Sequence, residues 1–174
     1  ISRGQLERTQ SHLADAVAKG AKVLTGGITR PELGPLMFAP TVLANVTDDM
    51  VICKTETFGP VCSIYVYADE SELLQRVNDT EYGLSAAIVS SSPSRARALA
   101  RKLRVGAVNI NEAFGAAYAS IDAPMGGMHA SGVGRRHGAE GLLKYTEVQT
   151  MATQSPWLPL GPGRFTDEQW ASIG

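Results

Sequence analysis

Between residues 61 and 110, apolar segments of strand-like composition alternate with segments of helical periodicity. The segments that predict strands are rich in β-branched, aromatic and small apolar residues, and they span residues 61–67, 84–90 and 105–110. A strand–helix–strand–helix–strand order favours right-handed crossovers and parallel strand pairing. The chain is therefore predicted to adopt an α/β fold built on an open, mostly parallel sheet.

The two helices of this pattern carry recognisable start signals. Asp69 followed by Glu72 has the spacing of an N-terminal capping arrangement, and the helix that follows should end before Gly83. Ser92-Pro93 places a capping hydroxyl next to a proline at a tolerated first-turn position. The predicted helices cover about residues 69–82 and 92–103.

The flanking regions predict simpler elements. Residues 4–19 have the apolar spacing of an amphipathic helix stopped by Gly20, and a glycine-dense loop extends from 115 to 138. A polar–apolar alternation over 146–153 resembles an exposed strand that needs a partner. The remaining predicted elements are a strand at 22–25, an extended segment at 38–43, a short helix at 139–144 and a proline-containing tail at 154–174, which Trp157 and Trp170 are expected to pin.

Composition narrows the classes of partner. The 174 residues carry 16 basic and 17 acidic side chains, a formal net charge of -1, so no overall positive field favours nucleic acid or an acidic membrane. No apolar run approaches the roughly 20 residues of a membrane-spanning helix. We therefore expect a soluble, cytoplasmic protein whose partners are small molecules or other protein chains. Because the chain starts at Ile1 and enters a helix at once, we also expect a fragment.

Neither the cysteines nor the histidines form a recognisable site. Cys53 and Cys62 lack paired metal or redox spacing and are expected to be reduced thiols, with Cys62 facing the core from its strand. The three histidines are scattered, so we expect no metal. Gly132, Gly134 and Gly138 follow a loop in a G-x-G-x-x-x-G spacing, which does not fit the dinucleotide fingerprint.

A candidate ligand site lies directly before the strand at 61–67. In the run Glu56-Thr57-Phe58-Gly59-Pro60, a carboxylate and an aromatic ring stand two residues apart at a Gly-Pro turn. A carboxylate can accept hydrogen bonds from two neighbouring sugar hydroxyls, and a ring offers a flat apolar contact. The pair Glu56 and Phe58 suits a ribose, although a surface glutamate beside a core phenylalanine explains the same pattern.

Five separated motifs together resemble the C-terminal third of the aldehyde dehydrogenase superfamily. They occur in order and read KTETFGPV, NDTEYGLSAAIVS, GAVNIN, MGGMHASGVGRRHG and YTEVQT. The stretches GAKVLTGG and FAPTVLANV match as well, so the resemblance covers roughly residues 4–153. The fourth motif is most similar to succinate-semialdehyde dehydrogenases. The sequence departs from the usual family pattern at Met125, where phenylalanine is commoner.

The resemblance implies a division of the chain and a set of site residues. Residues 1–145 would belong to the catalytic domain, 146–153 would form an oligomerisation strand, and 154–174 would be a C-terminal tail. Glu56 and Phe58 would bind NAD or NADP. The residues implied on the aldehyde side are Asn111, Glu112, Phe114 and Ser120.

The resemblance also implies a reaction whose central groups are not in this chain. A cysteine thiolate attacks the aldehyde, a hydride passes to NAD(P), and a glutamate activates water to hydrolyse the thioester. Both residues lie upstream of this region in the family, so no catalytic residue is assigned here and the isolated chain is expected to be inactive. The intact protein is expected to be a homodimer or homotetramer.

Two other interpretations are open. The chain could be a stand-alone, non-catalytic module that assembles through residues 146–153. Alternatively, the same architecture could serve a reductase of acyl phosphates or acyl-CoA, although the E-T-F-G-P run favours a dehydrogenase.

Overall fold

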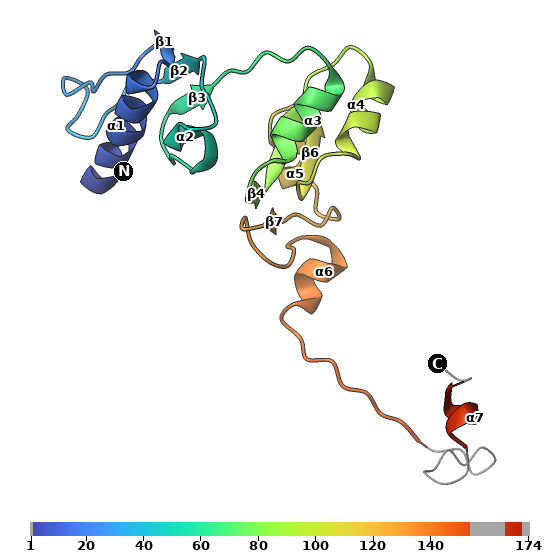
Figure 1. Ribbon diagram of the computed structural model, residues 1–174. Coiled ribbons are helices and arrows are strands. Elements are labelled where there is room, and N and C mark those ends of the chain that lie inside the picture. The colour runs from blue at the N-terminus through green and yellow to red at the C-terminus, as the bar shows by residue number, and fades with distance from the viewer. Residues whose placement is uncertain (1, 154–165, 172–174) are drawn as a thin grey trace.

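The computed structural model describes residues 2–153 and 166–171 and has an α/β fold (Figure 1). The first part of the chain contains a long helix, three short strands and a one-turn helix. Its elements are α1 (Arg3–Ala18), β1 (Lys22–Thr25), β2 (Thr41–Ala44), α2 (Val51–Lys54) and β3 (Val61–Ser63). Strand β2 pairs antiparallel with β1 and parallel with β3, which gives a mixed three-stranded sheet.

An extended segment leads from β3 to a second group of elements (Figure 1). These elements are α3 (Glu70–Asn78), β4 (Tyr82–Gly83), β5 (Ser85–Ile88), α4 (Pro93–Ala100), β6 (Ala107–Ile110) and α5 (Gly115–Ala119). Strands β5 and β6 are parallel, with Ser85 opposite Ala107 and Ile88 opposite Ile110. The β5–α4–β6 unit therefore confirms the second half of the predicted alternation.

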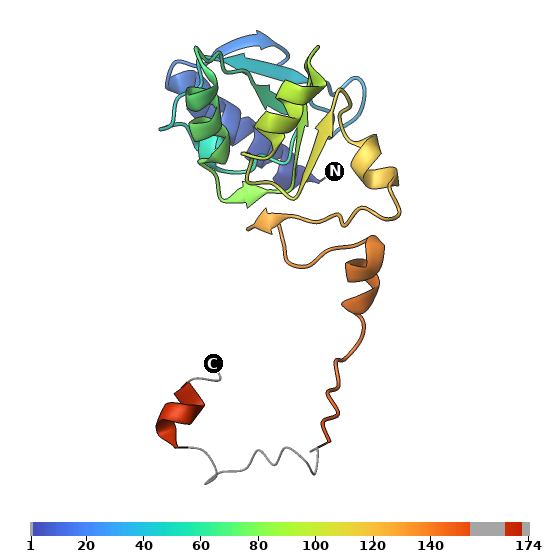
Figure 2. The same cartoon turned by 90° about the vertical axis from the view of Figure 1, so that its right-hand side faces the viewer.

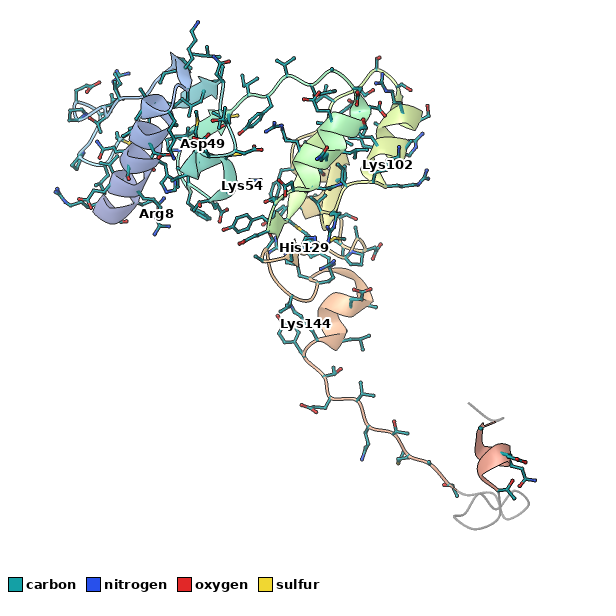
Figure 3. The ribbon with its side chains drawn as sticks, in the orientation of Figure 1. Arg8, Asp49, Lys54, Lys102, His129 and Lys144 are labelled. Atoms are coloured by element: carbon teal, nitrogen blue, oxygen red, sulfur yellow. The ribbon has the colours of Figure 1, made fainter. Side chains whose placement is uncertain are left out.

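The remaining described elements follow the β5–β6 pair. They are β7 (Met128–His129), which pairs antiparallel with β4, then α6 (Gly138–Leu143) and α7 (Asp167–Ala171). Beyond Lys144, residues 146–153 form no strand and run away from the rest of the described chain with exposed side chains (Figure 3). The predicted strand at 146–153 is therefore absent from this single chain. The expected pinning of the tail by Trp157 and Trp170 falls on side chains outside the described residues.

The predicted strand at 61–67 is confirmed only over Val61–Ser63, and the prediction of one open, mostly parallel sheet was wrong. Strand β3 ends at Ser63, and Val66 beyond it is 91% exposed. The physical reason is the absence of a neighbour, because β3 pairs with β2 and the described chain provides no strand that joins β3 to β5. Cys62 consequently faces solvent and does not pack in the core. Of residues 84–90, predicted as a buried strand, Ser85–Ile88 form β5, and they alternate between exposed and half-buried positions.

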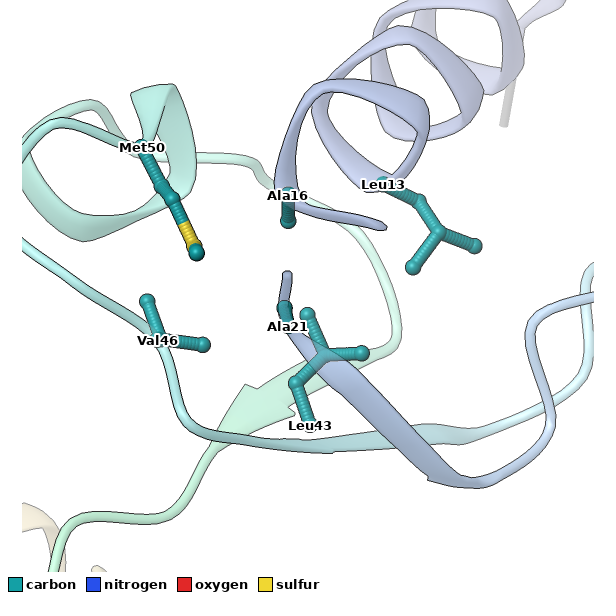
Figure 4. Close-up of a cluster of buried hydrophobic side chains, with 6 residues drawn as sticks. All are labelled: Leu13, Ala16, Ala21, Leu43, Val46 and Met50. Carbon is teal, nitrogen blue, oxygen red and sulfur yellow. The ribbon is translucent and has the colours of Figure 1, made fainter. Parts of the chain in front are cut away.

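The buried apolar core lies in the first part of the chain. It joins one face of α1 to strand β2 and to the segment before α2, and it consists of Leu13, Ala16, Ala21, Leu43, Val46 and Met50 (Figure 4). Leu43 and Met50 are almost completely enclosed. Burying a side chain of this size contributes about 1.5–3 kcal/mol relative to leaving it exposed. This packing fixes α1 as the support for the loop before β3.

Helices α3 and α4 begin as the sequence predicts. The Asp69 carboxylate accepts hydrogen bonds from the backbone N–H groups of Ser71 at 2.8 Å and Glu72 at 3.0 Å. These hydrogen bonds lower the pKa of Asp69, the side-chain bond from Ser71 having the largest effect. Ser92 caps α4 in the same way and Pro93 follows it at the first turn. None of the described helices is long and apolar enough to cross a membrane.

Two ion pairs connect α3 to the first part of the chain. Arg76 lies 3.2 Å from Asp48, and Lys54 lies 2.5 Å from Asp79. All four side chains are largely exposed, so these pairs contribute little to stability. They join side chains of α2 and of the segment before it to side chains at the C-terminal end of α3, while the ribbons of α2 and α3 lie in separate groups in Figure 1 and overlap in the turned view of Figure 2.

Candidate functional site

The loop that carries Glu56 and Phe58 is held against helix α1. The Gln5 side-chain amide donates hydrogen bonds to the carbonyl oxygens of Thr57 at 2.6 Å and Phe58 at 2.9 Å. His12 Nδ1 lies 3.2 Å from the hydroxyl of buried Thr57. Three groups of the loop are thus fixed by one rigid helix.

A close approach between the loop and α1 explains why the residue at position 59 is glycine. A β-carbon on Gly59 would lie 2.4 Å from the hydroxyl oxygen of Thr9, which is buried under the loop. At that distance one of the two groups would have to move. Glycine at position 59 therefore allows the loop to lie directly on the helix.

This anchoring leaves both predicted cofactor residues turned outward. Phe58 has a φ of 53°, in the left-handed region, and its side chain is 69% exposed. Glu56 is exposed, and no carboxylate interaction is present for it within residues 2–153 and 166–171. An outward aromatic ring offers a flat apolar contact to a ligand.

Glu56 and Phe58 lie between two hollows of the surface. One, of about 490 Å³, is lined by α1 residues and by Phe38, Gly59 and Pro60. The other, of about 510 Å³, extends toward β4 and β5 and is also lined by Ala130 and Ser131. A free carboxylate and an exposed ring beside a cavity of this size fit the sugar and ring of a nucleotide. This agrees in kind with the NAD or NADP contact that the sequence predicts for Glu56 and Phe58, and that contact stays a prediction.

The predicted aldehyde-side residues form a separate loop after β6. Asn111 has a φ of 57°, and its side-chain amide pairs with the backbone of Ser90 through bonds of 2.8 and 3.0 Å. Ser120 accepts a hydrogen bond from the backbone N–H of Ala123 at 3.3 Å. The polar groups of both side chains thus shape the loop and connect it to the end of β5.

Glu112 organises the start of α5. Its carboxylate oxygens accept hydrogen bonds from the backbone N–H groups of Phe114 at 3.0 Å and Ala116 at 2.9 Å. The hydrogen bonds from Ala116, then Phe114 and Gly115, lower the pKa of Glu112 to about 2. A carboxylate used in this way is a helix cap, and it presents Phe114 at the surface.

Two residues that the sequence did not single out complete this loop. The ring of Phe114 stacks on Tyr118 with a centroid separation of 5.2 Å. The guanidinium carbon of Arg136 lies 5.4 Å from the centre of the Tyr118 ring. Arg136 is part of the quoted glycine-rich motif, but nothing in its spacing indicated a contact with α5.

The residues predicted for the cofactor and those predicted for the aldehyde line different parts of the described surface. The two hollows that Glu56 and Phe58 border include no residue of the loop from 111 to 120.

A third hollow between α2 and α3 contains Tyr65, whose pKa is raised to about 12, mainly by burial and then by a bond with Cys53. Within the described ranges, no three His, Cys, Asp or Glu side chains gather as a metal site.

Known proteins similar to this chain are aldehyde dehydrogenases. The aldehyde dehydrogenase family model matches residues 1–151. A Mycobacterium ulcerans protein, provisionally named succinate-semialdehyde dehydrogenase (NADP+) 2, is 55% identical over 153 residues, which cover 88% of this chain and 30% of that protein. A similarly named Mycolicibacterium smegmatis protein is 52% identical over the same shares. The chain thus spans about 30% of the length of these curated relatives.

Solved structures give the same result. The succinate-semialdehyde dehydrogenase of Burkholderia pseudomallei superposes with a TM-score of 0.74 at 40% identity, over 82% of this chain and 29% of that one. The NAD+ complex of a Bacillus cereus aldehyde dehydrogenase has a TM-score of 0.78 at 36% identity, over 86% of this chain and 30% of that one. On the extent of the family match and the agreement in fold, this chain belongs to the aldehyde dehydrogenase family.

Proposed function

We propose that the chain is the C-terminal part of an NAD(P)-dependent dehydrogenase that oxidises an aldehyde, succinate semialdehyde in particular, to the carboxylic acid. The observation that carries this proposal is the outward Glu56–Phe58 pair, fixed on α1 by Gln5 and bordering two hollows. The names of the mycobacterial relatives support the substrate, and the NAD+ complex of the Bacillus cereus protein supports the cofactor.

In the proposed reaction, this chain binds the cofactor and shapes the aldehyde site. Bound NAD(P)+ supplies a hydride acceptor. Glu56 would accept hydrogen bonds from ribose hydroxyls, and the Phe58 ring would pack beside the nicotinamide end. The loop with Asn111, Glu112, Phe114 and Ser120 would line the aldehyde side. The cysteine nucleophile and the glutamate base would come from the region upstream of this chain.

The test uses the intact polypeptide that contains this chain, assayed for NADH or NADPH formation with succinate semialdehyde. Glu56→Gln keeps the size of the side chain and removes its charge. Losing hydrogen bonds to a charged group costs about 1.5–3 kcal/mol, so kcat/KM for the cofactor should fall about 10- to 100-fold. Glu7→Gln, an exposed carboxylate of α1, is the matched control and should change nothing.

Three results would count against the proposal. If the intact protein oxidised no aldehyde with either cofactor, the proposed function would be ruled out. Unchanged cofactor kinetics in Glu56→Gln would rule out Glu56 as part of the cofactor site. A denaturing mass measurement on the native protein decides whether these residues are part of a longer chain. A mass equal to that of the 174 residues would contradict the proposed C-terminal fragment.

A non-catalytic assembly role is the second candidate, because the C-terminal segment exposes two large apolar side chains. Val148 is 93% exposed and Met151 is 89% exposed, and both lie on a stretch without a partner strand in the described chain. Extended apolar stretches with unpaired backbone groups are templates for strand addition. This role is compatible with a dehydrogenase whose subunits join through 146–153.

A further inference from the structure

Arg136 is held in a defined place beside the aldehyde-side loop. Its backbone N–H donates to the carbonyl of Met125, and the Met125 N–H donates back to the Arg136 carbonyl, both at 2.7 Å. Its guanidinium carbon lies 5.4 Å from the Tyr118 ring centre, and Nη2 lies 3.5 Å from the sulfur of buried Met125. Backbone and side chain are thus both restrained.

The positive charge of Arg136 is not neutralised within the part of the chain that the structure describes. Three other arginines form ion pairs with carboxylates, and they are Arg30, Arg76 and Arg95. Arg135, the neighbour in sequence, donates to the carbonyl oxygens of Gly127 and Gly134. Arg136 is exposed and contacts only a thioether and an aromatic face, which leave donors of its planar fork available.

The nearest acidic side chain of the loop is already engaged. Glu112 directs both carboxylate oxygens at the backbone N–H groups of Phe114 and Ala116. This capping orders α5 and therefore the Tyr118 ring on which Arg136 rests. The arrangement presents a cation beside the Tyr118 ring, on which Phe114 stacks, and within the described residues no carboxylate forms an ion pair with it.

We infer that the Arg136 guanidinium binds the carboxylate of the aldehyde substrate and thereby selects aldehydes that carry a carboxylate at the far end. Arg136 is a specificity-determining residue in this scheme and takes no part in bond making. The inference rests on the proposed aldehyde oxidation and adds the side chain that recognises the substrate carboxylate. A bidentate guanidinium–carboxylate pair is a strong and directional polar contact.

The test compares two aldehydes of equal chain length in the intact enzyme, succinate semialdehyde and butanal. Arg136→Met keeps an unbranched stem against Tyr118 and removes the charge. We expect kcat/KM for succinate semialdehyde to fall about 10- to 100-fold, while kcat/KM for butanal changes less than about twofold. Arg136→Lys keeps the charge without the fork and should give an intermediate loss, again for the carboxylated aldehyde alone. Arg101→Met, on the exposed end of α4, is the matched control.

A binding measurement separates this inference from the proposed function. Calorimetric titration with succinate, the carboxylate product, needs no turnover, and its Kd should rise about tenfold or more in Arg136→Met. An equal loss for both aldehydes, or an unchanged succinate Kd, would overturn the role of Arg136. If the wild-type enzyme oxidised neither aldehyde, the proposed function would fail, and the succinate titration would still decide whether Arg136 binds a carboxylate.

Discussion

The side-chain amide of Gln5 donates a 2.9 Å hydrogen bond to the backbone carbonyl of Phe58. This bond joins the first helix of the chain to a residue in the left-handed region of backbone space. Left-handed φ values are unfavourable for an aromatic residue unless the surroundings impose them. Gln5 is therefore a positioning residue for the Phe58 ring.

Replacing Gln5 should loosen the cofactor loop. Gln5→Leu keeps the side-chain volume and removes both hydrogen bonds, so the intact enzyme should lose about 1 kcal/mol of stability. If the loop binds the cofactor as proposed, KM for NAD(P)+ should rise severalfold, with kcat affected less, because the loop itself takes no part in the reaction. Gln10→Leu, on the exposed face of α1, is the control and should leave KM unchanged. Equal effects of the two variants would show that the bond to Phe58 has no role in cofactor binding.

Glu112 gives a prediction for pH dependence. Its pKa is about 2 in the folded protein against an ordinary value of 4.5, because Ala116, Phe114 and Gly115 donate backbone hydrogen bonds to the carboxylate. A carboxyl with a lowered pKa stabilises the folded state above its unfolded pKa, and this stabilisation disappears as the pH falls from about 4.5 to about 2. Glu112→Gln should therefore lower Tm at neutral pH.

The difference in Tm between wild type and Glu112→Gln should narrow as the pH falls below about 4.5. Thermal unfolding followed by circular dichroism at several pH values measures it. Glu147→Gln, an exposed carboxylate of the C-terminal segment, should show no such trend. If the difference in Tm stayed constant down to the lowest pH at which both proteins fold, the charge of Glu112 would have no effect on stability.

Local signals explain why the helices were predictable. The caps at Asp69 and Ser92 involve residues within three positions of each other, so the sequence carries all the information that sets those helix starts. The strand at 61–67 depended on a partner, and β2 pairs with it only as far as Ser63. A local sequence pattern does not show which distant segments will pair.

The candidate site was likewise predictable only where local sequence was sufficient. The motif placed Glu56 and Phe58 at the entrance of a strand, and the structure has them there, beside β3. The contacts that present them come from Gln5 and Thr9, which lie far away in the sequence. The approach of Arg136 to Tyr118 is likewise a tertiary contact. Residue types could be read from the motifs, but their neighbours could not.

The exposed C-terminal segment predicts how subunits assemble. If 146–153 joins a sheet with a second copy, Val148→Glu should place a charge in that interface and shift the intact enzyme toward smaller species. Size-exclusion chromatography with light scattering measures the shift. Gln10→Glu, on the exposed face of α1 and outside the segment, is a control that should leave assembly intact. An unchanged mass for Val148→Glu would argue against assembly through this segment.

The closest backbone approach in the second part of the chain involves two glycines. A β-carbon on Gly106 would lie 1.6 Å from the carbonyl oxygen of Gly126, which packs the entrance of β6 against the segment before β7. Backbone cannot move aside as a flexible side chain can, so Gly106→Ala should destabilise the intact enzyme by about 3 kcal/mol. The segment after Gly126 leads to Arg136, so kcat/KM should fall too.

Gly4→Ala provides the matched control for this steric argument. Gly4 lies near the start of α1, and a β-carbon there would meet no atom within 4 Å. The same change should therefore be neutral or stabilise the helix by about 0.5–1 kcal/mol. Urea unfolding of both variants measures the two effects. A Gly106→Ala protein as stable as Gly4→Ala would mean that the approach to Gly126 relaxes freely, and the segment before β7 would then be too mobile to hold Arg136 in one place.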